Sequence, residues 1–80
     1  MRSSEKADDD RLRALLREIR LEAGLRQEDV AERLRRPQSY VSNLEAGDKT
    51  LDFLEVKRLC GALGIGFVDF VRRFETGKDE

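Results

Sequence analysis

The sequence has no histidine and no tryptophan, and it has only one cysteine and one proline. Without histidine, the chain lacks the commonest general base and cannot build a Ser-His-Asp or Cys-His catalytic pair. A lone cysteine cannot form an internal disulfide, and a zinc site of cysteines and histidines is excluded. No glycine-rich phosphate loop or clustered carboxylate motif is present either. The sequence therefore predicts a protein that is not an enzyme and that holds no metal or cofactor.

Long hydrophobic runs are also missing from the chain. No apolar stretch approaches the roughly 20 residues that a membrane helix needs. The first ten residues are polar and acidic, unlike the basic and then apolar pattern of a signal peptide. We therefore expect a cytoplasmic protein with no membrane partner.

Charge of one sign does not dominate the sequence. The 80 residues, enough for one small domain, carry 16 basic and 17 acidic side chains, a net charge of −1. Residues 11–50 are mildly basic, and nearly all of their cations are arginine. Arginine forms forked hydrogen bonds with phosphate and guanine, but it is equally common on solvated helix surfaces. Charge alone therefore does not select a nucleic-acid partner.

The spacing of apolar residues predicts an all-α domain. Helical periodicity occurs at about residues 10–23, 27–34, 37–46, 52–63 and 67–75. We expect the aspartates at 8–10 to cap the first of these helices, and Gly24 to end it. Cys60 falls on the apolar stripe of the fourth, which predicts a buried core residue rather than a reactive thiol. The predicted organisation is a flexible acidic segment at 1–9, a domain at 10–75 and a polar tail at 76–80.

The second and third predicted helices carry a recognisable motif. A turn of about three residues joins them, which is the layout of a helix-turn-helix. Residues 24–31 read GLRQEDVA, and residues 38–47 read QSYVSNLEAG. The first string resembles the G-L-[ST]-Q-E-E-L-A opening, and the second the x-S-x-[IV]-S-x-[ILW]-E-x-G recognition segment, of the Xre family of phage-repressor-like regulators. The separation of the two strings and the following helix agree as well, so the resemblance covers about residues 10–66.

This resemblance implies a compact five-helix, lambda-repressor-like domain. The implied function is a sequence-specific transcriptional regulator of double-stranded DNA, most simply a repressor, with the helix at 37–46 in the major groove. The residues expected to contact bases are Gln38, Ser39, Ser42 and Asn43. Glutamine and asparagine can each form two hydrogen bonds with adenine. A solvated polar helix face would have the same composition.

Phosphate contacts are predicted for a second set of residues: Gln27, Tyr40, Arg36, Lys49, Thr50 and Arg13. The resemblance implies the role of Gln27, which should also brace Gln38, and of the loop that holds Lys49 and Thr50. The two arginines are included for their charge and position only, and each could be a solvated surface charge. Tyr40 could instead pack at the edge of the core or contact a thymine methyl group.

Two further features, an ion pair and a turn residue, concern the stability of the fold. The resemblance implies a structural ion pair between Arg20 and Glu45, although both could be solvated. Arg35 stands where the family often has glycine. If that position needs a left-handed backbone, arginine costs about 1 kcal/mol there.

Family members usually bind a pseudo-palindromic operator as a two-fold dimer. The last predicted helix offers a candidate dimer interface for such a homodimer, made of Phe67, Phe70, Val71 and Phe74. The same side chains could instead complete the core of the monomer. A different class of function also remains open, a protein-interaction module such as the antitoxin of a toxin–antitoxin pair. The few residues expected outside the domain make a wrapping segment for a protein partner less favourable.

Overall fold

The computed structural model describes residues 2–78, with side chains described for residues 6–77. In this range the chain forms five helices and no strand, as the sequence predicted. The helices, in chain order, are α1 (Arg2–Glu22), α2 (Gln27–Leu34), α3 (Gln38–Ala46), α4 (Phe53–Leu63) and α5 (Phe67–Lys78).

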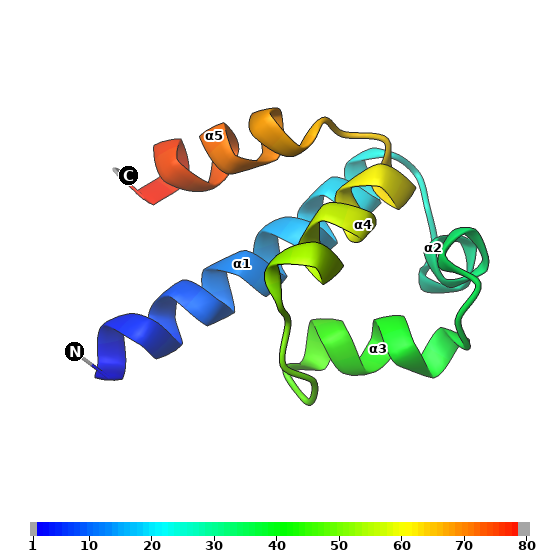
Figure 1. Ribbon diagram of the computed structural model, residues 1–80, viewed down its shortest axis with the longest axis horizontal. Coiled ribbons are helices and arrows are strands. Elements are labelled where there is room, and N and C mark those ends of the chain that lie inside the picture. The colour runs from blue at the N-terminus through cyan, green and yellow to red at the C-terminus, as the bar shows by residue number, and fades with distance from the viewer. Residues whose placement is uncertain (1, 79–80) are drawn as a thin grey trace.

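The five helices enclose one core. α1 and α4 lie next to each other in the middle of the domain, and α2 and α3 pack together at one side of them (Figure 1). α5 packs on α1 and α4 at the opposite side, away from α3. α3 is therefore held from behind by α1 and α2, and its other side faces outward.

The core is built from small and medium-sized apolar side chains. Val30 and Cys60 are each only 1% exposed, and Val41 and Leu44 of α3 are each 2% exposed. Ala31, 2% exposed, lies where α2 packs on α3, and its small side chain suits that close approach. The prediction that the cysteine is a core residue is confirmed, and its burial raises the pKa of the thiol to about 11.

The boundaries of α2, α3 and α4 agree with the prediction to within one residue. Local signals fix them. At the start of α4, the carboxylate of Asp52 accepts a hydrogen bond from the backbone N–H of Glu55 (2.7 Å), and the carboxylate of Glu55 accepts one from the backbone N–H of Asp52 (3.1 Å). This reciprocal capping box satisfies two amide groups that the helix leaves unpaired. At the end of α3, Gly47 takes the left-handed conformation (φ 89°) that glycine adopts without strain.

The prediction for the N-terminus of the chain was wrong. α1 begins at Arg2 and not near residue 10, so residues 2–9 continue the first helix. The aspartates at positions 8, 9 and 10 form ion pairs along the helix surface with Arg11, Arg13 and Lys6, respectively. Pairs three and four residues apart stabilise a continuous helix. The aspartates therefore lie inside α1 and do not cap it.

The C-terminal helix also differs from the prediction. α5 runs to Lys78, so the polar tail predicted from residue 76 begins inside the helix, and residues 79–80 lie outside the described residues. Arg73 attaches α5 to α1 through Glu22 (2.8 Å) and Glu18 (3.3 Å). Phe70 is 3% exposed and belongs to the core, as the alternative reading of these side chains had it. One face of α5 must complete the core of an 80-residue domain, and Phe70 is the residue that does so.

Candidate nucleic-acid interface

The turn between α2 and α3 has the left-handed backbone that the sequence put in question. Arg35, the last cap of α2, has φ 59° and ψ 46°, and it is the one described residue other than glycine with a positive φ. Its backbone N–H donates to the carbonyl of Glu32 (3.1 Å), which closes the helix. Pro37 then precedes α3 in an extended conformation. The helix-turn-helix is thus complete, with the arginine in a conformation that glycine adopts more easily.

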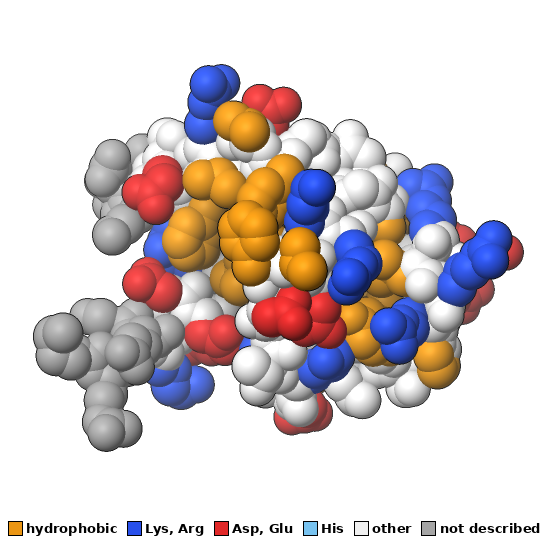
Figure 2. Space-filling view, in the orientation of Figure 1, with side chains coloured by type: hydrophobic (Ala, Val, Ile, Leu, Met, Phe, Trp, Pro, Cys, Tyr) orange, Lys and Arg blue, Asp and Glu red, His pale blue; other side chains and the backbone are white. Residues whose placement is uncertain are grey.

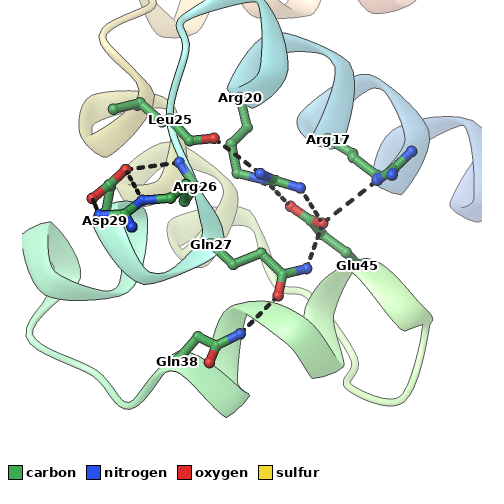
Figure 3. A network of polar contacts seen from close by, with 8 residues as sticks. All are labelled: Arg17, Arg20, Leu25, Arg26, Gln27, Asp29, Gln38 and Glu45. Carbon is green, nitrogen blue, oxygen red and sulfur yellow. Dashed lines mark hydrogen bonds and ion pairs between the residues drawn. The ribbon is translucent and has the colours of Figure 1, made fainter.

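A buried ion pair connects α1 to α3. Nε and Nη2 of Arg20 donate to the two carboxylate oxygens of Glu45 at 2.7 and 3.0 Å (Figure 3). The two side chains are 8% and 11% exposed. Nη1 of Arg20 donates to the carbonyl of Leu25, just before α2. The predicted ion pair is confirmed, and it fixes α3 against both α1 and the start of α2.

A chain of side-chain amides continues from this pair to the outer surface. Nε2 of Gln27 donates to Glu45 (2.9 Å), and Nε2 of Gln38 donates to the amide oxygen of Gln27 (3.0 Å) (Figure 3). The predicted brace is therefore confirmed. A glutamine amide group has two hydrogens, and the brace uses one hydrogen of Gln38. The other hydrogen and the amide oxygen form the donor and acceptor pair that adenine requires in the major groove.

The outward face of α3 is polar and uncharged. Gln38, Ser39 and Asn43 are exposed and Ser42 is half-buried, whereas Val41 and Leu44 of the same helix are buried. The four residues predicted to contact bases therefore lie on one side of one helix. The only charged residue of α3 is Glu45, whose carboxylate is taken by the ion pair. Hydrogen-bonding groups, and not charges, dominate this surface.

A compact cluster of charged and aromatic groups stands beside this face. The hydroxyl of Tyr40 donates to Glu55 (2.9 Å), and the ammonium of Lys49 lies 2.9 Å from the same carboxylate oxygen. The guanidinium carbon of Arg36 and the ammonium nitrogen of Lys49 lie 5.2 and 5.4 Å from the centre of the Tyr40 ring, within the range of a cation–π contact. Glu55 therefore holds together Tyr40 and Lys49, two residues predicted to contact phosphate, and a third, Arg36, joins them through the Tyr40 ring. The sequence analysis missed Glu55, although its position three after Asp52 marks a capping box.

The groups of this cluster shift one another's pKa values. The hydrogen bond from Lys49 is the largest cause that lowers the pKa of Glu55 to about 2, with the backbone N–H of Asp52 and the Tyr40 hydroxyl adding to it. The same contact raises the pKa of Lys49. Burial, followed by the neighbouring carboxylate, raises the pKa of Tyr40. Tyr40 is half-buried and packs against the core, so the core-edge alternative describes its ring.

The structure gives Arg13 a different role from the predicted phosphate contact. The side chain is buried, 7% exposed, and its guanidinium donates to the carboxylate of Asp9 and to the backbone carbonyls of Leu44 and Lys49. The two carbonyl acceptors lie 31 and 36 residues along the chain from Arg13. The charge and sequence position of Arg13 alone therefore did not reveal that its side chain is buried. Arg13 is a structural residue that ties the end of α3 and the following loop to α1.

Two further exposed residues, Thr50 and Arg17, are considered together with this face. Thr50, which is exposed, follows Lys49 in the loop after α3, as the prediction required. Arg17 of α1 has a side chain that is 61% exposed and lies 3.9 Å from Glu45 (Figure 3). The sequence analysis did not select Arg17, because nothing in the local pattern separates it from other surface arginines.

An apolar patch covers a different part of the molecule, over α5 and the start of α4 (Figure 2). We define it by its most exposed members, Phe53 (68%), Val68 (63%), Leu54 (54%) and Val71 (42%). The ring of Phe53 meets that of the half-buried Phe67 edge to face, with centroids 5.1 Å apart. The patch borders a groove of about 490 Å³. Phe53 and Val71 of the patch line this groove together with Phe67 and Phe74. All four residues predicted for a dimer interface thus line this groove, although Phe70 is only 3% exposed.

Within the described residues, no group of histidine, cysteine or acidic side chains is arranged to hold a metal ion. None of the described helices has the length and apolar character needed to cross a membrane.

Comparisons with known proteins agree with this geometry. The helix-turn-helix domain family matches residues 11–69. A solved structure of an XRE-family like protein from Pseudomonas syringae pv. tomato str. DC3000 is 33% identical, with a TM-score of 0.88 over 94% of this chain and 92% of that one. This chain belongs to the Xre family of helix-turn-helix regulators. The match begins and ends close to the limits of the resemblance seen in the sequence, residues 10–66.

Other solved structures with lower identity share the fold of this Xre-family chain. The restriction-modification controller protein C.Esp1396I is 22% identical, with a TM-score of 0.84 over 91% of this chain and 96% of that chain. A tetramer of the same controller in complex with its natural 35 base-pair operator gives a TM-score of 0.80 at 23% identity, over 86% of this chain and 91% of that one. Among curated proteins, none matches the sequence.

Proposed function

We propose that this Xre-family protein is a transcription regulator that binds double-stranded DNA sequence-specifically through α3. The observation that carries the proposal is the chain of contacts from Arg20 through Glu45 and Gln27 to Gln38. It fixes a base-reading amide on an exposed helix before any DNA arrives. A side chain that is already oriented loses less conformational entropy on binding, so this arrangement favours selective readout.

Each α3 helix offers only four groups for base contacts, Gln38, Ser39, Ser42 and Asn43, which suffice for a few base pairs. We therefore propose that two copies bind one pseudo-palindromic operator, each reading one half-site. The apolar patch supports this arrangement, because large exposed apolar groups that gather on one surface mark interaction sites. The patch lies over α5 and α4, so a dimer formed there leaves α3 open to DNA.

In the simplest mode of action, the bound dimer is a repressor that covers an operator and excludes polymerase. The phosphate contacts come from the cations beside α3, Arg17, Arg36 and Lys49, and from Gln27, Tyr40 and Thr50. The operator of the distant controller protein C.Esp1396I is bound by a tetramer of that protein, which agrees with the use of several copies on one DNA.

Selection of binding sites from random duplex DNA tests this proposal. The wild type should enrich a palindromic site, whereas a variant with Gln38→Ala and Asn43→Ala should lose the enrichment and keep weak binding to all duplexes. A base-specific pair of hydrogen bonds discriminates by about 1–3 kcal/mol, so the double change removes most of the selectivity. Thr76→Ala, a polar change on the surface of α5, is the matched control and should select the same site.

The outcomes separate the proposed function from its alternative. Enrichment that survives in the double variant would place sequence reading outside α3. No enrichment by a folded wild type would overturn the proposal and favour the protein-interaction module, which copurification of a stable protein partner would then identify.

A further inference from the structure

We propose that the carboxylate of Glu55 occupies the place of a DNA phosphate in the free protein and so limits the affinity of the protein for DNA. The inference rests on the proposed function. It assigns to Glu55 a role in setting the affinity for DNA. Glu55 is an acidic residue on a surface proposed to bind the anionic phosphates of DNA.

The contacts of Glu55 are those that a phosphate oxygen would make. Its Oε2 atom lies 2.9 Å from the ammonium of Lys49 and accepts a hydrogen bond of 2.9 Å from the hydroxyl of Tyr40. Lysine and tyrosine are both common donors to DNA phosphates. Arg36 contributes a second positive charge across the Tyr40 ring. Two groups expected to meet phosphate therefore converge on one carboxylate that belongs to the protein, and a third cation lies against the ring of one of them.

The role of Glu55 in the capping box does not explain its charge. That role uses the Oε1 atom, which accepts the backbone N–H of Asp52, and the backbone N–H of Glu55 itself. Glutamine serves equally well at this position of a capping box. The negative charge therefore acts on Lys49 and Tyr40, and helix capping alone does not require it.

Hydrogen-bond chemistry makes Glu55 and a phosphate competitors. The Tyr40 hydroxyl has one hydrogen, which it cannot donate to a phosphate while it donates to Glu55. The ion pair with Lys49 must likewise be weakened or broken before the ammonium neutralises a phosphate. After the exchange, the unpaired carboxylate stays close to the DNA backbone and repels it. Binding thus replaces an internal anion by an external one, and the gain in free energy is smaller than the cations alone would give.

Glu55→Gln removes the negative charge and keeps the size of the side chain. Its one amide oxygen can replace either Oε1 at the backbone N–H of Asp52 or Oε2 at the Tyr40 hydroxyl, and glutamine is an accepted residue at this position of a capping box. We expect the variant to bind a labelled duplex of mixed sequence up to about fivefold more tightly than the wild type, the effect of one exposed ion pair. The same factor should apply to the selected operator, because phosphate contacts carry no sequence information.

Two matched variants test the cause. Glu75→Gln removes one negative charge from the exposed surface of α5, away from α3, and should leave affinity within experimental error. Lys49→Met removes the competing cation, and adding Glu55→Gln to it should give a smaller gain than in the wild type. Thermal unfolding of each variant confirms that the fold is retained.

The results are decisive in either direction. Unchanged or weaker binding by a folded Glu55→Gln variant would overturn the inference and make Glu55 a positioning residue. An equal gain from Glu75→Gln would also overturn it, because net charge would then be the cause. A wild type that binds neither duplex would instead contradict the proposed function itself.

Discussion

Arg20 and Glu45 lie 25 residues apart in the sequence and share two parallel hydrogen bonds of 2.7 and 3.0 Å beneath the recognition helix. Both side chains are almost fully buried. A buried charge without a partner is unfavourable, so each residue depends on the other. The pair therefore fixes the position of α3 relative to α1. The hydrogen bonds of the Gln27 and Gln38 amides continue from the pair and fix the side chain of Gln38 at the surface.

Removing one partner should destabilise the domain strongly. We expect Arg20→Met to lower the free energy of unfolding by about 3–5 kcal/mol, because it leaves Glu45 buried and without its guanidinium. Urea unfolding followed by circular dichroism measures the change. Arg17→Met is the matched control, since Arg17 lies 3.9 Å from the same carboxylate but is 61% exposed, and it should change stability by less than about 1 kcal/mol. Similar losses from the two variants would contradict a special role for the buried pair.

Arg35 is predicted to be a site of stored strain. Because its φ of 59° suits glycine better than arginine, Arg35→Gly should stabilise the protein by about 1 kcal/mol. For a domain of this size, that corresponds to a rise of roughly 4–8 °C in the unfolding midpoint. Arg35→Ala removes the same charge but keeps a Cβ atom, so it should give no such rise. If glycine and alanine shift the midpoint equally, the charge and not the backbone is responsible.

The residues that defined α2 to α4 before the structure was known carry local signals. Pro37 and Gly47 mark helix ends through their backbone preferences, and Asp52 does so through its side-chain cap, so short stretches of sequence suffice. The Arg20 pair and the Gln27 brace were predicted because they belong to a family pattern. Arg13 could not be placed in this way, because the carbonyls that it binds are brought near it only by the packing of α3 on α1. Phe70 and Val71 show the same limit, since adjacent apolar residues divide between core and surface according to how α5 is rotated.

The cluster around Glu55 predicts a pH dependence of stability. The folded protein lowers the pKa of Glu55 from an ordinary 4.5 to about 2, so the ionised carboxylate stabilises the folded state. That contribution is complete above about pH 4.5 and is lost as the pH falls towards 2. The stability advantage of the wild type over Glu55→Gln should therefore shrink on acidification. Urea unfolding of both proteins near neutral pH and at about pH 3 measures it.

A suitable comparison for this titration is Glu75→Gln, which controls for the general effect of removing one carboxylate. A difference between wild type and Glu55→Gln that stays constant across this range would show that the charge of Glu55 contributes nothing to stability.

The apolar patch predicts self-association. Val71→Glu places a charge on the exposed surface of α5, and we expect it to convert a dimer into a monomer in sedimentation at micromolar concentration, because a buried charge without a partner opposes association. Leu21→Glu introduces the same charge at an exposed leucine of α1 outside the patch, and it should leave the dimer intact. A wild type that sediments as a monomer at tens of micromolar would contradict the dimer, and an equal effect of both variants would move the interface elsewhere.

The buried guanidinium of Arg13 has a consequence for where this protein can be shortened. One of its partners, Asp9, lies in the part of α1 that the sequence assigned to a flexible segment. A chain that starts at residue 10 would keep every residue of the helix-turn-helix but would leave Arg13 buried with one anion fewer. Its other two partners are the carbonyls at the end of α3 and in the loop with Lys49. The first turns of α1 therefore help to hold α3 in place. Removing them would loosen the outward face of α3, although they do not touch that face.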